Sequence, residues 1–122
     1  MRYSKNGMPV VFVVATEWKL RAAVRAELRE RGIDALGMDS AEDVGRALAG
    51  GVMPAVVVLE ANAELAGDPA IRGLVARVPT ILVASRTETV ALPRVAAVFY
   101  RPVRIGEIVA KVSELLERGE VA

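Results

Sequence analysis

The stretch VVFVVATEWKL, residues 10–20, decides the fold of this chain. Its first residues are continuously apolar and rich in β-branched valine, a pattern typical of a strand buried on both faces of a parallel sheet. A helical pattern follows over residues 17–31, with Thr16 in position to cap it and Gly32 to end it. The residues on the apolar face of this predicted helix are Leu20, Ala23, Val24 and Leu28.

The same strand-and-helix unit recurs along the rest of the chain. Short apolar runs predict further strands at residues 33–36, 55–59, 80–84 and 95–100. Helical patterns predict helices at residues 41–49, from residue 69 onward, and at 105–118. Ser40 and Asp68 stand where they would cap the first two of these helices. Residues 86–94 have room for a turn or two of helix, or for a loop, because Pro93 interrupts them.

This alternation predicts a doubly wound parallel sheet with helices on both faces. With five strands and right-handed crossovers, we expect the flavodoxin-like strand order 2-1-3-4-5, with a shortened fourth helix. We expect one domain over residues 1–122, with its core at about residues 9–118. Ligands of such sheets bind at the carboxyl ends of the strands, so functional residues are expected there.

Composition excludes several classes of function. Hydrophobic residues make up 53 % of the chain and charged residues 25 %, which is typical of a globular protein. Cysteine and histidine are both absent, which removes disulfides, thiolate chemistry and the commonest metal ligands and general bases. The net charge of +1 gives no electrostatic case for binding nucleic acid or a membrane. We therefore expect a cytoplasmic protein that is not an enzyme and uses no metal or cofactor.

Four stretches, in this order, resemble the receiver domain of bacterial two-component response regulators. They are VVFVVATEWKLRAAVRAELRERGI, SAEDVGRALAGG, PAVVVLEAN and FYRPV, the last followed by an amphipathic helix. The resemblance covers nearly the whole chain. It implies a flavodoxin-like fold and a role in phosphorelay signal transduction, exerted through a protein partner.

The resemblance also implies a phosphoacceptor pocket, and this chain departs from the family pattern there. The acidic pair that holds Mg²⁺ in the family aligns with Ala15 and Thr16, and the phosphoacceptor aspartate aligns with Glu60. Glu17 stands one residue further on and is expected to turn away with the start of the helix. Because Mg²⁺ needs oxygen ligands, usually carboxylates, we expect a pseudo-receiver that does not catalyse its own phosphorylation.

The remaining pocket positions also differ from the family. The family's Ser or Thr after the fourth strand aligns with Ala84, with Ser85 one residue out of register, and its Lys-Pro pair aligns with Arg101-Pro102. Arginine offers a two-pronged donor to a carboxylate, so Arg101 is a candidate ion-pair partner of Glu60. The alternative is that Glu60 points to water. The resemblance implies a cis peptide at Arg101-Pro102, with an ordinary trans turn as the alternative.

Receiver domains contact partners or dimerise through the face made by the fourth helix, the fifth strand and the last helix. The resemblance implies a similar face here, with a homodimer as one expected assembly. The residues expected on this interaction face are Arg94, Val98, Tyr100, Arg104, Glu107 and Lys111. Arg21, Arg25 and Arg29 form a separate stripe, interpreted as a solvated helix face with a Glu17–Arg21 pair, or as a docking stripe for an acidic partner.

The function hypothesis that follows is a phosphorylation-independent protein-interaction module. One alternative is an unusual but active phosphoacceptor. Another is a flavodoxin-like domain that binds a small ligand or nucleotide, with Trp18 and Tyr100 stacking on a planar ring. The first strand-to-helix turn lacks the glycines that let backbone N–H groups approach a phosphate, which disfavours the last alternative.

Overall fold

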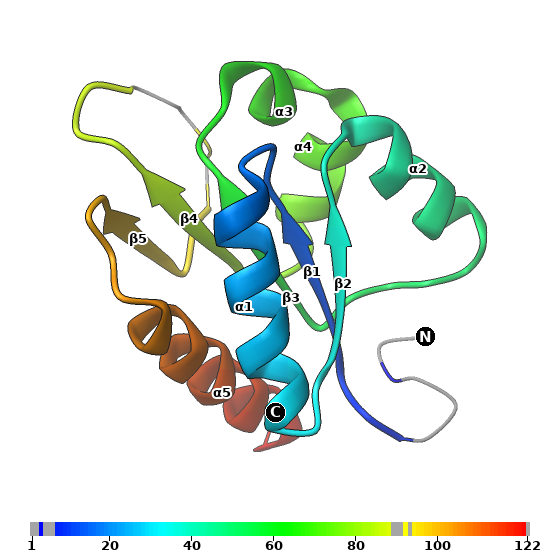
Figure 1. Cartoon of the computed structure of the whole chain (residues 1–122). Coiled ribbons are helices and arrows are strands. Elements are labelled where there is room, and N and C mark those ends of the chain that lie inside the picture. Colours follow the sequence, from blue (N-terminus) through cyan, green and yellow to red (C-terminus); the bar gives the residue numbers. More distant parts are fainter. Residues whose placement is uncertain (1–2, 4–6, 89–91, 93, 122) are drawn as a thin grey trace.

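The computed structural model describes residues 3, 7–88, 92 and 94–121. Five parallel strands form one sheet in the order β2-β1-β3-β4-β5 (Figure 1). The strands are β1 (Val10–Val14), β2 (Asp34–Met38), β3 (Val56–Glu60), β4 (Thr80–Ala84) and β5 (Ala97–Tyr100). The predicted sheet and its strand order are therefore confirmed, and β2 and β5 are its two edges.

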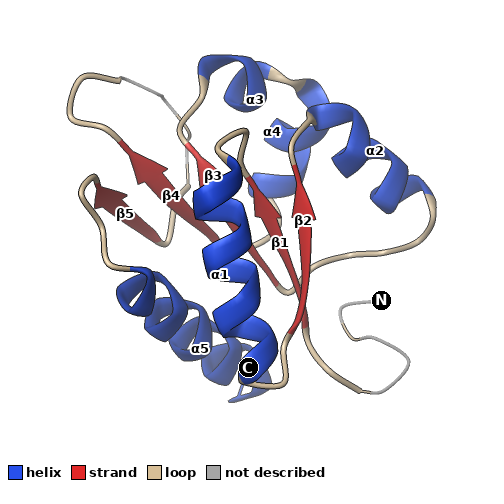
Figure 2. Ribbon diagram, in the orientation of Figure 1, coloured by secondary structure: helices blue, strands red, loops and turns tan. Residues whose placement is uncertain are grey.

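Helices cover both faces of the sheet (Figure 2). On one face lie α1 (Trp18–Glu30) and α5 (Ile105–Val121), and on the other α2 (Ala41–Ala49), α3 (Ala63–Gly67) and α4 (Pro69–Val75). The short helix α3 was not predicted. Within the part of the chain that the structure describes, no helix stands between β4 and β5, and no helix is long and apolar enough to cross a bilayer.

The predicted shortened fourth helix falls partly outside the described residues. Residues 85–88, 92 and 94–96 are described, and none of them is helical. Residues 89–91 and 93 lie outside the described part of the chain. The described portion of this crossover is therefore loop, the second of the two forms expected for a segment that contains a proline.

The sheet is buried on both sides, which explains its continuous apolar runs. Every residue of β1 is buried. Val11 and Val13 point into the core beneath α1 and α5, while Val10, Phe12 and Val14 point into the core beneath α2 and α4. Alternate residues of a strand face opposite sides, so a strand with two covered faces needs no polar positions.

Local signals at the helix ends behave as predicted, with one exception. Gly32 adopts a φ of +77° after α1, and the Ser40 hydroxyl accepts a hydrogen bond from the Asp43 N–H at 3.2 Å. Helix α1 is the exception, because its N-cap is Glu17 and no side chain caps it. The prediction that Thr16 caps α1 is wrong, since its hydroxyl bonds elsewhere, as described below.

The arginine stripe of α1 is bonded to backbone carbonyls. The Arg21 guanidinium donates to Ala15 O at 2.7 Å, and the Nε atoms of Arg25 and Arg29 donate to Ala35 O at 3.2 and 3.4 Å. The predicted Glu17–Arg21 side-chain pair is absent from the described contacts, since Arg21 turns to the strands instead. Arg25 and Arg29 are exposed, as expected of a solvated helix face, and their contacts with the outer edge of β2 were not predicted.

Removing the side-chain cap of α4 tests whether such local signals stabilise the helix ends. Asp68 Oδ1 accepts from the N–H groups of Ala70 and Ile71 at 2.8 and 3.3 Å. Asp68→Ala is expected to lower the free energy of unfolding by about 1 kcal/mol, because both donors lose their acceptor. Urea unfolding measures this, with Asp68→Asn as a control that keeps the accepting oxygen. Equal losses in the two variants would contradict a capping role.

Candidate functional site

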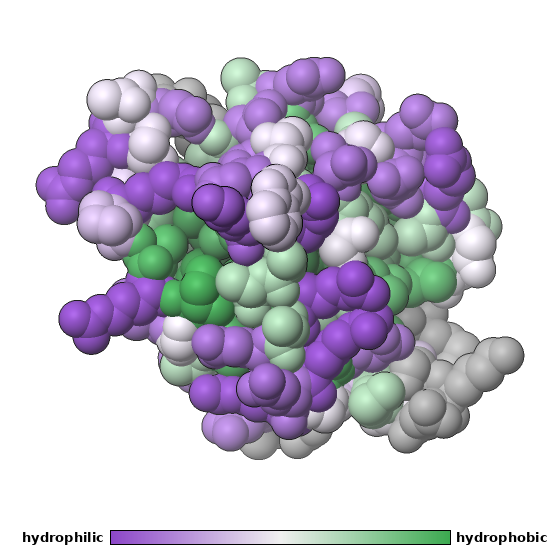
Figure 3. Space-filling view, in the orientation of Figure 1, coloured by the Kyte–Doolittle hydropathy of each residue, from purple (hydrophilic) through white to green (hydrophobic). Residues whose placement is uncertain are grey.

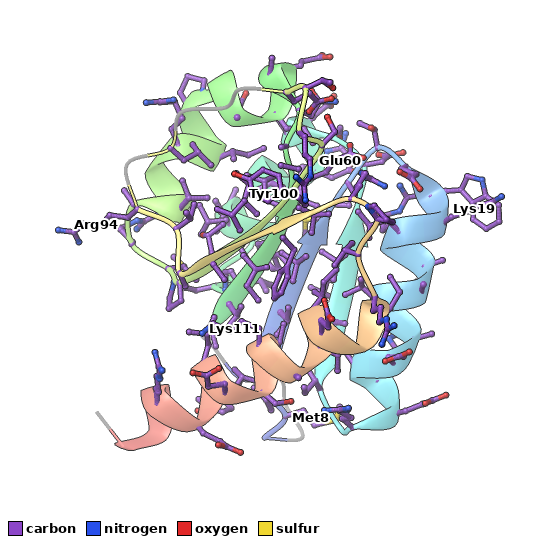
Figure 4. The ribbon with its side chains drawn as sticks, turned by 90° about the vertical axis from the view of Figure 1, so that its left-hand side faces the viewer. Met8, Lys19, Glu60, Arg94, Tyr100 and Lys111 are labelled. Atoms are coloured by element: carbon purple, nitrogen blue, oxygen red, sulfur yellow. The ribbon has the colours of Figure 1, made fainter. Side chains whose placement is uncertain are left out.

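A polar cluster forms where the strands end. Glu60 is the last residue of β3, Thr16 and Glu17 follow β1, and Arg101 follows β5. The carboxyl ends of parallel strands meet at one edge of a sheet, which brings residues distant in sequence together. Figure 4 shows Glu60 at this end of the sheet, above the crossing β5. We call Thr16, Glu17, Glu60 and Arg101 the Glu60 cluster.

Both oxygens of the Glu60 carboxylate accept hydrogen bonds. Oε1 accepts from the Thr16 N–H at 3.0 Å and from the Thr16 hydroxyl at 2.6 Å. Oε2 lies 3.3 Å from Arg101 Nη2, which donates to it. The Glu60 side chain is 12 % exposed, so these donors replace most of its water. Thr16 thus holds the carboxylate in place instead of capping α1.

Arg101 bridges two carboxylates. Its Nη1 lies 2.7 Å from Glu17 Oε2 while its Nη2 reaches Glu60. Its backbone N–H donates to Ala84 O at 2.8 Å, which ties the turn after β5 to the end of β4. The peptide Arg101-Pro102 is cis, as predicted. The prediction that Glu17 turns away is wrong, because the guanidinium lies within ion-pair distance and draws its carboxylate inward.

The other predicted pocket residues stand around the cluster without joining it. Ala15 and Ala84 are buried and bring no polar side-chain atom. The Ser85 hydroxyl lies 3.1 Å from that of Thr87, so it pairs within its own loop. Pro102 is exposed. The structure thus brings together Thr16, Glu60 and Arg101, and adds Glu17, which was expected to turn away from them.

The residues present do not fit a magnesium ion. Ala15 offers no side-chain oxygen, the Thr16 hydroxyl is donated to Glu60, and a guanidinium occupies the space between the two carboxylates. Mg²⁺ prefers several oxygen ligands and is repelled by a cation. Over the described ranges, no group of three or more acidic, histidine or cysteine side chains is placed to hold a metal.

An open groove of about 620 Å³ borders the cluster, between the start of α1 and the turn into α5. Glu17 and Arg101 form part of its rim, and its floor is apolar, with Leu20 and Ile105 among its residues. Figure 3 shows hydrophobic side chains exposed in a hollow on this side of the molecule. Trp18, at the start of α1, is 63 % exposed and therefore does not cover the cluster.

The predicted interaction face lies on the β5 side of the molecule. Val98 and Tyr100 are 37 % and 52 % exposed, whereas Phe99 between them packs against the core. Lys111 is half-buried and lies 3.2 Å from Glu114. Figure 4 shows Arg94, Tyr100 and Lys111 on the side that faces the viewer. Also exposed are Arg94, Arg104 and Glu107.

No protein-family model matches the sequence, and no curated protein matches it either. Solved structures do match. A response regulator receiver protein from Burkholderia phymatum is 21 % identical with a TM-score of 0.73, over 89 % of this chain and 95 % of that chain. One from Pseudomonas putida is 25 % identical with a TM-score of 0.70, over 88 % and 97 % of the chains. One from Sinorhizobium medicae WSM419 is 14 % identical with a TM-score of 0.73, over 93 % and 98 %.

Proposed function

Because the chain has the fold of response-regulator receiver domains, we propose that it is an atypical receiver domain that acts in signal transduction independently of phosphorylation. It is a single domain with its core at residues 9–118, and it works as a protein-interaction module. The observation that carries the proposal is the Arg101 guanidinium, which lies within ion-pair distance of both Glu60 and Glu17.

The site lacks the groups that phosphoryl transfer needs. The charge on a transferring phosphoryl group needs a metal or several cations around it, and the donor set here disfavours a metal. Glu60 is one methylene longer than aspartate, which displaces any nucleophilic oxygen from the position of an aspartate oxygen. Both of its oxygens are also engaged by donors from Thr16 and Arg101.

The cluster supports one fixed state in place of a switch. Glu60, Thr16 and Arg101 come from the ends of β3, β1 and β5, so their contacts tie three separate loops together. A guanidinium paired with two carboxylates is a stronger tie than a single lysine contact, since an ion pair to Glu17 adds to the charge-assisted hydrogen bond to Glu60. The proposed module therefore presents its surfaces without an activating signal.

The partner of this module is a protein, and the proposed contact surface is the interaction face named above. Val98 and Tyr100 are large apolar side chains exposed on a strand, and exposed apolar residues rimmed by charge are typical of protein-binding surfaces. The charged residues proposed for the same face, Arg94, Arg104 and Glu107, are all exposed.

A titration with Mg²⁺ followed by beryllofluoride tests phosphorylation independence. The Thr16 amide, which donates to Glu60 Oε1, serves as the NMR probe. We expect no saturable shift of this amide, because Arg101 and the missing ligands keep the metal out. Glu60→Gln is the matched control for non-specific ion effects. A saturable shift in the natural chain that Glu60→Gln abolishes would overturn the proposal and show a working phosphoacceptor.

A further inference from the structure

The backbone peptide that joins Ala15 to Thr16 is held at both of its polar ends. Its N–H, from Thr16, donates to Glu60 Oε1 at 3.0 Å. Its carbonyl, from Ala15, accepts a hydrogen bond from Arg21 Nη1 at 2.7 Å. Because a peptide group is planar, a donor that fixes its carbonyl also fixes the direction of its N–H. Arg21 therefore helps to aim the Thr16 N–H at the Glu60 carboxylate.

The charge of Arg21 acts along the same peptide. A carbonyl that accepts from a guanidinium is polarised, and its peptide N–H becomes a better donor, since hydrogen bonds in a chain strengthen one another. From Glu60 the chain of contacts continues to Arg101 and Glu17. Among the described contacts, Arg21 itself makes no hydrogen bond or ion pair with Glu60. The bonded route from Arg21 to Glu60 is therefore this peptide.

Gly37 of β2 leaves the space that the Arg21 side chain occupies. Helix α1 packs along β2 (Figure 1). A Cβ atom on Gly37 would lie 3.1 Å from Arg21 Cγ and 3.3 Å from its Cδ, closer than carbon atoms normally pack. The φ of Gly37 is not positive, so its backbone conformation does not require glycine. Because glycine weakens a strand interior, the close approach of Arg21 accounts for glycine at this position.

We propose that Arg21 is a positioning residue of the Glu60 cluster and that Gly37 is the residue that admits it. The support of the cluster then extends from the ends of β1, β3 and β5 to the edge strand β2. A larger side chain at position 37 pushes the Arg21 stem away and lengthens its bond to Ala15 O. This inference rests on the proposed function, since it names what regulates the fixed state in which Glu60 is held.

NMR of the metal-free chain tests the role of Arg21 through the Thr16 amide and the Glu60 carboxyl carbon. Arg21→Met keeps most of the stem and removes every donor. We expect the Thr16 amide to exchange with water about tenfold faster, as for the loss of one hydrogen bond to a charged group, and the Glu60 carboxyl carbon to shift. Arg21→Lys restores one donor and is expected to recover most of both changes. A residue that only packs would leave the Glu60 carbon unmoved.

Gly37→Ala and Gly37→Val test the admitting role. Either residue suits a strand better than glycine, so strand propensity alone predicts a tighter β2. We expect the Thr16 amide and the Glu60 carbon instead to move in the direction seen in Arg21→Met, further for valine than for alanine. In an Arg21→Met background, Gly37→Ala is expected to move neither resonance further, because the guanidinium that it displaces is already gone.

Two matched controls separate this route from general effects of the substitutions. Arg25→Met removes a neighbouring guanidinium whose Nε donates to Ala35 O instead. Gly45→Ala adds a Cβ atom on α2 at a position where nothing lies within 4 Å of it. Both variants are expected to leave the Thr16 amide and the Glu60 carbon in place.

Unchanged resonances in Arg21→Met overturn the inference, as do equal changes in Arg25→Met. An undiminished effect of Gly37→Ala in the Arg21→Met background overturns the role of Gly37. If Gly37→Val fails to fold, Gly37→Ala decides in the same way. The Mg²⁺ titration uses the natural chain and this series uses no metal, so the proposed function and this inference can fail independently.

Discussion

Arg101→Met is expected to lower the free energy of unfolding by about 2 kcal/mol, because it leaves the Glu60 carboxylate with little water and no counter-charge. The Glu60 side chain is 12 % exposed, so water recovers little of the lost interaction. Glu17 contributes less, since its side chain is 44 % exposed and can be solvated. Urea unfolding of the natural chain and of the variant measures the difference.

Arg118→Met is the matched control. Arg118 also pairs with a glutamate, Glu114, but both side chains are largely exposed and the pair lies on one helix. Its loss is expected to change stability by less than about 0.5 kcal/mol. A double-mutant cycle with Glu60→Gln then isolates the Arg101–Glu60 coupling. If Arg101→Met lowers the free energy of unfolding no more than Arg118→Met does, the Glu60 cluster does not hold the three loops together.

Phe12→Ala is expected to have the largest effect on stability, a loss of about 4 kcal/mol. Phe12 is fully buried in β1, an interior strand of the sheet, with Leu36 and Val57 opposite it on the neighbouring strands. Removing the ring loses its burial and leaves a cavity, which the two flanking strands cannot close because each is held by its own ladder. The same unfolding measurement applies.

Two controls separate the cavity from other effects. Phe12→Leu keeps most of the volume and is expected to cost less than about 1.5 kcal/mol. Tyr100→Ala removes an aromatic ring that is 52 % exposed, and is expected to change the stability of the dilute chain by about 0.5 kcal/mol or less. Similar losses for Phe12→Ala and Tyr100→Ala would show that burial in the structure does not govern stability here.

The fold could be predicted because its signals are local. Apolar runs, caps and glycines lie within a few residues of the elements that they define, as at Ser40 and Gly32. The helix at Ala63–Gly67 was missed because five residues leave no periodicity to detect, although Asn62, whose side chain accepts from the N–H groups of Glu64 and Leu65, was a signal. Strand β2 extends through Gly37, a residue that reads as a turn.

The site was harder to predict because its contacts join distant residues. The resemblance placed Thr16, Glu60 and Arg101 at one end of the sheet, and they lie there. It gave no sign that the Thr16 hydroxyl would donate a hydrogen bond to Glu60 instead of capping α1, or that Glu17 would pair with Arg101. These outcomes depend on competition between partners far apart in the sequence, which periodicity and spacing do not record.

The arginines of α1 have a consequence for how far association can proceed. Open-ended growth of a sheet into a fibril requires head-to-tail joining, in which the β5 edge of one molecule meets the β2 edge of the next. Arg25 and Arg29 already occupy the Ala35 carbonyl that an incoming strand would need. Strand addition at the β2 edge therefore has to displace these two guanidinium contacts, which disfavours open-ended growth of the sheet through that edge.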